Sequence, residues 1–372
     1  MNHHLRPNSK VCKVLLSSPT RLQGNYNQED LIIESVSPNM MGIHSIQNNR
    51  FDRLKSEILL GRYHYMLVLD VIPDNEQSII IPDYSYVGEY ISIALSVLYG
   101  KRFDNHGMIE GSGHFWMPHY EEIITFSPYH YYPVYSNFPR KDGNISLDLK
   151  ECASIVNFTI HGKDEKLFRY FFNAAKFYLS SIKSIDFDLD KAYLDLITCG
   201  EILSNFYEYS EDELYGHDTQ LYRLLEKLVS YNIPDEDLSF IKKRLYQVKR
   251  KFFLTLKKLI NESFFKNTES RVENAKFTRE NFEENIKAAY DLRSRYVHAG
   301  FEFKDWIEVY AGSESHLSEV QVPDLIPNVD DKELREMIKK TPKYVGLERM
   351  IRFALLRFLH TNGVYIHSDL DS

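Results

Sequence analysis

The chain has 372 residues, a formal net charge of −8, 43% hydrophobic residues and 26% charged residues. This length allows one large domain or two ordinary ones, and the composition is that of a soluble globular protein. The acidic balance argues against a protein that coats nucleic acid indiscriminately, although a local basic groove is compatible with it. No stretch approaches the roughly 18–20 apolar residues that span a bilayer, so we expect no membrane partner.

The cysteines and the N-terminal residues indicate a reducing compartment. Cys12, Cys152 and Cys199 are odd in number, far apart and not in metal-ligand spacing. Residues 1–10 are polar and lack the apolar middle section of a secretory signal. We therefore expect a cytoplasmic protein without a metal or another cofactor.

The first 145 residues predict a mixed α and β domain. β-rich runs alternate with Pro, Asn and Gly signals, and they occur at residues 11–16, 31–36, 65–72 and 78–81, with further extended segments at 114–117 and 123–126. Helical stretches are expected at 51–60 and 86–99. Residues 127–143 are rich in proline and tyrosine, which is typical of a linker, and we place the linker between the two domains at 146–160.

The rest of the chain predicts long helices. Helical periodicity covers residues 164–184, 188–209, 213–231, 235–261, 278–298 and 331–360, the last with a break near Pro342. The predicted fold is therefore an α+β N-terminal domain, residues 1–145, followed by an all-α helical bundle, residues 161–372.

The predicted helix 278–298 carries an arginine where an apolar residue is expected. Thr278 is a candidate N-cap and Gly300 a candidate terminator. Between them an apolar stripe contains Arg293, together with Phe282, Ile286, Ala289, Tyr296 and Val297. A guanidinium cannot lose its charge to enter a core, so it needs a partner or a wet cleft. A structural ion pair with a neighbouring helix, or a side chain that reaches out from the seam, explains it equally well.

His298 is five residues after Arg293. On an ideal helix the two side chains point about 140° apart. They can converge only if the helix is ending or if a second protomer completes the site. The alternative is a helix-terminal histidine that satisfies backbone carbonyl groups.

The segment Tyr290-Asp291-Leu292-Arg293-Ser294-Arg295-Tyr296-Val297-His298-Ala299-Gly300 resembles the signature of the HEPN superfamily (higher eukaryotes and prokaryotes nucleotide-binding), in which an Arg precedes a His by four to six residues near the end of a long helix. The ending is similar to the Apea-like branch of bacterial defence proteins. The resemblance covers residues 160–365, but only the motif helix is specific. In the last helix it extends to an apolar face that we expect Arg349, Arg352 and Arg357 to edge; its members are Leu347, Met350, Ile351, Ala354, Leu355 and Phe358. Ser294 departs from the Asn, Asp or His that many members have there.

The resemblance implies a metal-independent endoribonuclease that works as a homodimer, with a role in phage defence or as a toxin. Histidine suits proton transfer near neutral pH, and a fixed guanidinium stabilises charge on a phosphate. Arg293 and His298 would be catalytic, and Glu201 corresponds in position to a polar residue that contacts the pair in this superfamily. The alternative for Glu201 is a simple ion pair with a lysine at the surface. The alternative function is a non-catalytic HEPN scaffold that binds RNA or nucleotide.

Residues 242–258 are basic without an intervening acid, and they suggest an RNA-binding stripe. Tyr246, Phe252 and Phe253 interleave with the cations and could stack on bases; the predicted RNA-binding residues are Lys242, Lys243, Arg244, Lys249, Arg250 and Lys251. The same pattern fits the solvated face of a long helix.

Two other readings find less support in the sequence. The spacing of His106, His114, His119 and His130 is too loose for a typical zinc site. A DNA-binding regulator would need a basic recognition helix, and the first 145 residues contain none.

Overall fold

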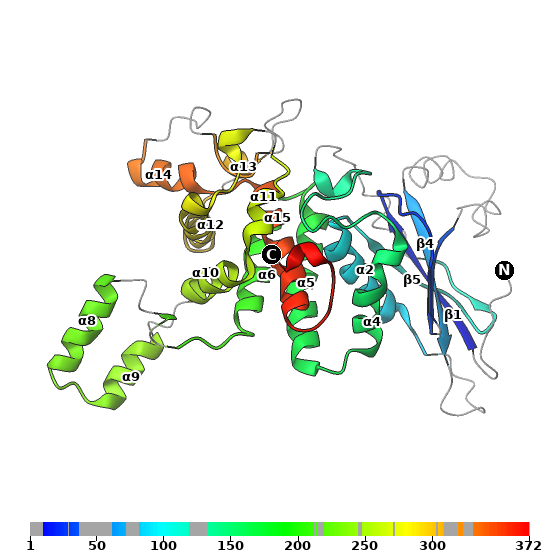
Figure 1. Ribbon diagram of the computed structural model, residues 1–372, viewed down its shortest axis with the longest axis horizontal. Coiled ribbons are helices and arrows are strands. Elements are labelled where there is room, and N and C mark those ends of the chain that lie inside the picture. Colours follow the sequence, from blue (N-terminus) through cyan, green and yellow to red (C-terminus); the bar gives the residue numbers. More distant parts are fainter. Residues whose placement is uncertain are drawn as a thin grey trace.

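The computed structural model describes residues 10–28, 30–36, 62–71, 82–118, 132–210, 213–214, 219–244, 248–270, 272–302, 304–308, 318–322 and 330–371. Figure 1 shows an antiparallel sheet at one end, a helical body in the middle and a helical hairpin at the other end. This arrangement confirms an N-terminal sheet region followed by a largely helical part. The predicted elements at 51–60, 78–81 and 123–126 lie outside the described residues.

The sheet has six strands in the order β2-β3-β4-β1-β5-β6. The central strand β1 (Lys10–Ser18) pairs antiparallel with β4 (Tyr63–Val71) and with β5 (Asp104–Gly111). β3 (Leu31–Val36) pairs with β4, and the short strands β2 (Tyr26–Asn27) and β6 (His114–Phe115) form the edges. The predicted strands at 11–16, 31–36 and 65–72 are confirmed, whereas β5 was not predicted because its sequence DNHGMIEG is polar and contains two glycines.

One face of the sheet packs on α2 (Ser85–Tyr99), which confirms the helix predicted at 86–99. Alternate residues of β1 (Cys12, Val14 and Leu16) join the main core, as expected for a strand with a period of two. Gly88 of α2 allows this close approach, because an added Cβ would lie 2.5 Å from a side-chain atom of Val14.

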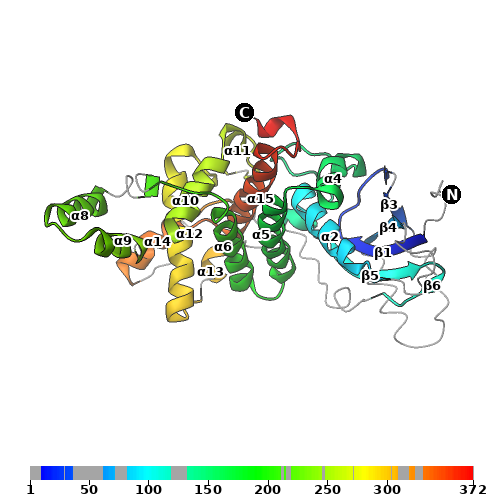
Figure 2. The ribbon, with the colours of Figure 1, turned by 90° about the horizontal axis from the view of Figure 1, so that it is seen from below.

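The helical part is built around α15 (Tyr344–Thr361), which lies among α5 (Glu165–Ser184), α6 (Leu189–Ser204) and α10 (Val248–Leu259), as Figure 2 shows. The motif helix α12 (Arg279–Ala299) packs on α10, α6 and α14 (Lys332–Lys340), and the short helices α11 (Glu262–Lys266) and α13 (Lys304–Ile307) complete this part. The predicted break near Pro342 is confirmed, because α14 ends at Lys340 and α15 begins at Tyr344. The predicted helix 235–261 is wrong as a single element, because the chain forms α9 (Asp235–Arg244) and then α10.

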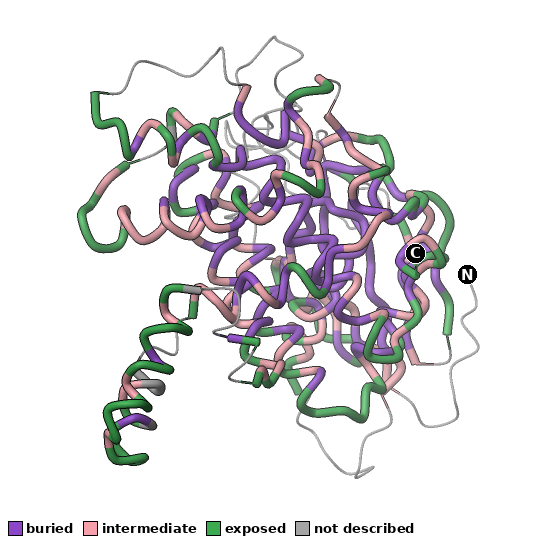
Figure 3. The backbone as a smooth tube through the Cα atoms, turned by 60° about the vertical axis from the view of Figure 1, so that its left-hand side comes forward, coloured by how far each residue is buried: buried purple, intermediate pink, exposed green. Residues whose placement is uncertain are grey.

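The hairpin of α8 (Thr219–Ser230) and α9 projects away from the body (Figures 1 and 3). It has a small apolar cluster of its own, formed by Leu214, Leu225 and Leu238. Figure 3 shows that most of the hairpin is exposed, in contrast with the buried interior of the body.

The segment predicted as a linker, residues 146–160, is packed structure. It contains the short helix η4 (Leu149–Cys152) and most of α4 (Ala153–His161), and Leu149, Cys152 and Ile155 are fully buried. One continuous apolar core includes side chains of the sheet, of this segment and of α15. A linker at residues 146–160 is therefore wrong, because the side chains of this segment are buried by contacts with distant parts of the chain.

A buried network of charges connects the N-terminal half to α15. Arg140 forms ion pairs with Glu348 and with Glu269, both at 2.7 Å. Arg352 pairs with Asp142 at 2.8 Å, and Arg349 pairs with Glu319 at 2.8 Å. Arg349 and Arg352 are fully buried, so the expectation that they edge the apolar face of the last helix is wrong, while Arg357 is partly exposed. The apolar residues predicted for that face are all buried.

A buried histidine in the sheet predicts a loss of stability in acid. His64 of β4 is 1% exposed, and both of its ring nitrogens lack a hydrogen-bond partner in the described part of the chain. Burial, and then the neighbouring His106 and Arg62, lower the pKa of His64 from 6.5 to about 4. Between these two pH values the unfolded chain binds a proton that the folded chain does not, so the free energy of unfolding falls by up to about 3 kcal/mol as the pH drops through this window.

Denaturant unfolding at pH 7 and at pH 4.5 measures this effect. In His64→Leu we expect a smaller difference between the two pH values than in the wild type. His161→Gln, at a half-exposed position on α4, should retain the wild-type difference. An equal pH response in the wild type and in His64→Leu would contradict the assignment.

Candidate functional site

The motif helix α12 has the boundaries that its sequence predicts. The Thr278 side chain accepts a hydrogen bond from the backbone of Asn281, whose own side chain completes a capping box, and Gly300 ends the helix with φ of 63°. Its buried face contains Phe282, Ile286, Ala289 and Leu292. Tyr296 of the predicted stripe packs against the core, whereas Val297 is 52% exposed and does not belong to the buried face.

Arg293 lies beside a carboxylate of the neighbouring helix α6. Its Nη2 atom is 3.5 Å from Oε1 of Glu201, and the exposed fractions of the two side chains are 26% and 14%. The guanidinium carbon is 5.5 Å from the ring centre of Tyr290, one turn earlier in α12. The arginine is thus paired with an inter-helix acid, as one reading of the sequence required, but it remains partly accessible to solvent.

Tyr290 links these two residues and was not predicted. Its hydroxyl donates a hydrogen bond of 2.8 Å to Oε1 of Glu201. Burial and this bond to Glu201 raise the pKa of Tyr290, so the phenol keeps its proton and remains a donor. The sequence contains one indication of this contact: Tyr290 is three residues before Arg293, and residues three apart share a helix face. We call Arg293, Glu201 and Tyr290 the Arg293 cluster.

His298 is exposed in the last turn of α12, and we find no hydrogen bond or ion pair to it among the described residues. The helix continues through Ala299, so the end of the helix does not bring His298 towards Arg293. Five helical residues separate the side chains by about 140° around the axis and about 7.5 Å along it. A shared site therefore needs a second copy of the chain.

Acidic side chains surround the end of α12. Partial burial and then the carboxylates of Asp188, Asp190 and Glu302 raise the pKa of Tyr296. Arg295 faces Asp331 at 3.7 Å and Glu333 at 3.6 Å. An anionic substrate at this surface would therefore depend on Arg293 for local positive charge.

The predicted RNA-binding residues are divided between two helices. Lys242, Lys243 and Arg244 belong to α9, and their side chains lie outside the description. Lys249 forms an ion pair with Asp291 of the motif helix, Arg250 donates to the carbonyl of Leu214 at 3.0 Å, and Lys251 is partly exposed. Of these α10 residues, Lys249 lies beside α12, whereas Arg250 faces Leu214.

The two phenylalanines of this segment that the structure describes do not form a stacking platform. Phe252 is fully buried and Phe253 is 5% exposed, whereas Tyr246 lies outside the described residues. The expectation of base stacking on the two phenylalanines is wrong, because α10 directs them into the core between α6 and α12.

Gly200 sets the distance between α6 and α10 beside the Arg293 cluster. A Cβ at this position would lie 2.4 Å from Cε2 of Phe252. We expect Gly200→Ala to lower the free energy of unfolding by about 1–3 kcal/mol, because the packed helices must shift. Chemical denaturation of Gly200→Ala in the wild type and in a Phe252→Leu background tests this, since the smaller side chain of leucine should reduce the cost. Equal costs in both backgrounds would show that the contact does not matter.

The sheet brings together polar residues that lie far apart in the sequence. Oγ of Ser17 is 2.7 Å from Nε2 of His106, and both residues are fully buried. Asp104 lies next to them and contacts Arg62, Arg102 and Lys183. Ser17 and His106 are separated by 89 residues, so only the pairing of β1 with β5 makes them neighbours.

Comparison of the chain with known proteins found no relative, since no family model, no curated protein and no solved structure matches it. Within the described ranges, no helix is both long and apolar enough to cross a membrane. The same ranges hold no group of three or more His, Cys, Asp or Glu side chains placed to bind a metal ion; His119 and His130 lie outside them.

Proposed function

We propose that this protein is a metal-independent endoribonuclease of the HEPN type, and that Arg293 and His298 act in a site shared by two copies of the chain. The observation that carries the proposal is the partly exposed guanidinium of Arg293, held beside Glu201 on a helix whose buried face is mainly apolar. A structural arginine could be replaced by an apolar side chain at such a position. A phosphate contact gives a reason for keeping the charge.

The proposed reaction divides proton transfer between two histidines. His298 of one copy takes the proton of a ribose 2′-hydroxyl, whose oxygen attacks the adjacent phosphorus. The bond from phosphorus to the 5′-oxygen breaks, and His298 of the second copy gives that oxygen a proton. Arg293 stabilises the charge on the phosphate oxygens, and the products carry a 2′,3′-cyclic phosphate and a 5′-hydroxyl.

Glu201 and Tyr290 act as positioning residues in this proposal. Glu201 faces Arg293 at 3.5 Å, and Tyr290 donates to the same carboxylate oxygen. Together they restrict where the guanidinium can lie before substrate arrives. We further propose that the N-terminal sheet region selects RNA or senses a trigger in the cytoplasm, and that cleavage arrests growth in defence against phage.

Cleavage of a defined RNA in the presence of EDTA tests the proposal. We expect fragments that end in 2′,3′-cyclic phosphate and 5′-hydroxyl groups, and no cleavage of DNA of the same sequence, because DNA lacks the attacking hydroxyl. Fragments with 5′-phosphate ends, or activity that EDTA abolishes, would contradict a metal-independent attack by the 2′-hydroxyl.

A non-catalytic scaffold that binds RNA or nucleotide is the second candidate. The ion pair with Glu201 offsets part of the charge of Arg293, and Asp188, Asp190 and Glu302 add negative potential near the end of the helix. This candidate predicts RNA binding without any product at high protein concentration.

A further inference from the structure

The hairpin of α8 and α9 carries large apolar side chains on its outer surface. Its own small cluster buries Leu214, Leu225 and Leu238, and Figure 3 shows most of the hairpin exposed. The exposed apolar side chains, with their exposed fractions, are Tyr222 (41%), Leu224 (51%), Val229 (54%), Tyr231 (65%) and Phe240 (59%). Apolar side chains gathered in this way mark an interaction surface, whereas single ones would not.

The apolar side chains of α8 cover a wider arc of the helix than its contact with α9 requires. Leu225 faces α9, because it belongs to the same cluster as Leu238. At about 100° per residue, Leu224 lies on one side of Leu225 and Val229 lies on the other. Both are more than half exposed. An apolar arc that extends beyond one neighbouring helix is typical of a helix in a larger bundle.

Basic side chains border one exposed edge of α8. Lys227 is three residues after Leu224 and four before Tyr231, so the three side chains share a face, and Arg223 lies one turn before Lys227. Arg223 and Lys227 are exposed, and neither forms an ion pair with a described residue, although the Lys227 ammonium group is 6.0 Å from the ring centre of Tyr231. Glu226, the acid of this helix, lies on the opposite edge.

Acidic side chains border the exposed ring of α9. Phe240 is four residues after Glu236 and three after Asp237, so these three side chains share a face, whereas Leu238 belongs to the inner cluster. Glu236 and Asp237 are exposed, and neither forms an ion pair with a described residue. The basic residues 242–244 follow at the end of the helix, and their side chains lie outside the description. The first two turns of α9 therefore present carboxylates beside an apolar ring.

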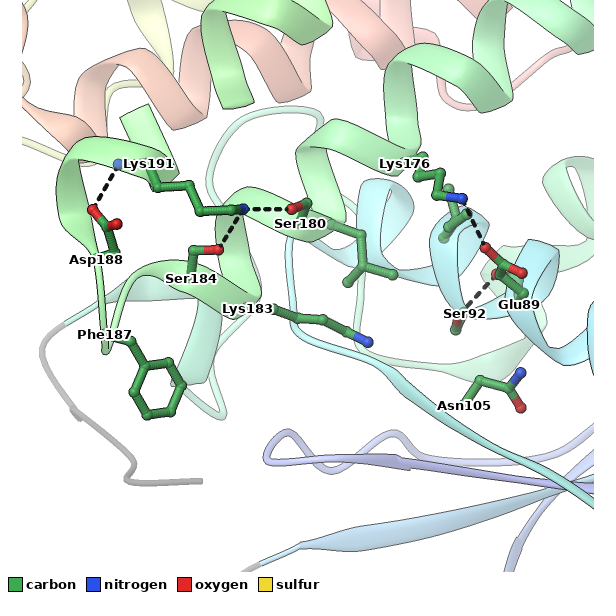
Figure 4. Close-up of a pocket in the computed structure, with 12 residues that line it drawn as sticks. Glu89, Ser92, Asn105, Lys176, Ser180, Lys183, Ser184, Phe187, Asp188 and Lys191 are labelled. Carbon is green, nitrogen blue, oxygen red and sulfur yellow. Dashed lines mark hydrogen bonds and ion pairs between the residues drawn. The ribbon is translucent and has the colours of Figure 1, made fainter. Parts of the chain in front are cut away.

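The charges of the hairpin differ in this respect from those of the cavity that α2, β5, α5 and α6 line. Figure 4 shows Lys176 of that cavity beside Glu89, and the two groups are 3.5 Å apart. Lys191 pairs with Asp195 at 2.7 Å. The lysines of the cavity are thus compensated by carboxylates of the same chain. The charges on the outer face of the hairpin remain available to a partner.

We propose that two copies of the chain associate through this hairpin. The basic, apolar edge of α8 in one copy packs on the acidic, apolar face of α9 in the other, and a two-fold axis repeats the contact. The four helices then bury Leu224, Tyr231 and Phe240 between them. A second copy is the occupant because one chain carries both halves of the contact. The ribonuclease proposal requires two copies but names no surface that joins them, and association is measured without RNA, so either proposal can fail alone.

Sedimentation velocity of the full-length protein at about 1 to 100 μM tests the apolar part of the contact. We expect the wild type to form dimers in this range. Phe240→Ser should weaken association about tenfold or more, because a central apolar side chain is lost from the contact. Phe138→Ser removes the same side chain from an exposed position outside the hairpin and should associate like the wild type. A wild type that stays monomeric throughout the range would overturn the proposal.

Charge reversal tests which surfaces meet. The double variants Arg223→Glu/Lys227→Glu and Glu236→Lys/Asp237→Lys should each associate about tenfold more weakly than the wild type, because like charges then face each other in both contacts.

An equimolar mixture of the two double variants should restore dimers, because each contact in the mixed dimer again joins opposite charges. Lys150→Glu/Lys163→Glu changes the same amount of charge at exposed positions outside the hairpin and should associate like the wild type. Circular dichroism compares the helix content of all variants. The proposal is overturned if the double variants associate like this control, or if their mixture remains as weakly associated as each variant alone.

Discussion

Replacement of His298 by alanine is expected to reduce RNA cleavage about 10²–10⁴-fold, because the imidazole is proposed to transfer protons at both the attacking and the leaving oxygen. Arg293→Ala should reduce it about 10²–10³-fold by removing the charge that faces the phosphate. His298 is exposed and Arg293 is partly exposed, so both variants should fold. Initial rates of cleavage, measured with circular dichroism of each variant, test this prediction.

The matched controls remove one arginine and one histidine that the proposal does not use. Arg295→Ala removes an arginine two residues away whose partners are Asp331 and Glu333, and His161→Ala removes an exposed histidine of α4. Both controls should cleave within a few-fold of the wild-type rate. If all four variants have the same rate as the wild type, Arg293 and His298 are not the catalytic pair.

Replacement of the buried Arg140 is expected to lower the stability of the fold strongly. This side chain is 3% exposed and pairs with Glu269 and Glu348, so its removal leaves two carboxylates buried without their cation. Arg140→Met should lower the free energy of unfolding by about 3–5 kcal/mol. Equilibrium unfolding in denaturant measures the change.

Arg295→Met provides the comparison, because Arg295 also faces two acids but its side chain is 35% exposed. Its removal should change the free energy of unfolding by at most about 1 kcal/mol. Similar changes in the two variants would mean that burial of the Arg140 network contributes nothing measurable to stability.

Several long helices of this fold, among them α5, α6 and α12, could be predicted from the sequence because their apolar residues repeat with the period of a helix. Thr278 and Gly300 marked the ends of α12, and Pro342 marked the division between α14 and α15. β5 could not be predicted, because its polar residues are buried by pairing with β1 and not by their own hydrophobicity. The packing of residues 146–160 was hidden for a similar reason, since their burial depends on contacts with distant segments.

The candidate site, too, could be predicted only as far as the pattern of a single helix allows. An arginine within an apolar stripe indicated that a partner was needed, and the structure places Glu201 next to Arg293. The role of Tyr290 and the burial of Phe252 depend on how α6, α10 and α12 pack against one another. The apolar pattern of one helix carries no information on this packing. The buried pairs of Arg349 and Arg352 are a further example, because their carboxylate partners lie at least 30 residues away in the chain.

We propose that a working site needs His298 from two copies of the chain, because one regular helix cannot bring His298 to Arg293. Wild-type protein and His298→Ala should be mixed in increasing ratio at constant total concentration, allowed to exchange subunits, and assayed for RNA cleavage. If both copies supply a histidine to one site, activity falls with the square of the wild-type fraction, to about a quarter in an equal mixture. Activity that falls in direct proportion to the wild-type fraction, to about a half, would contradict a shared site.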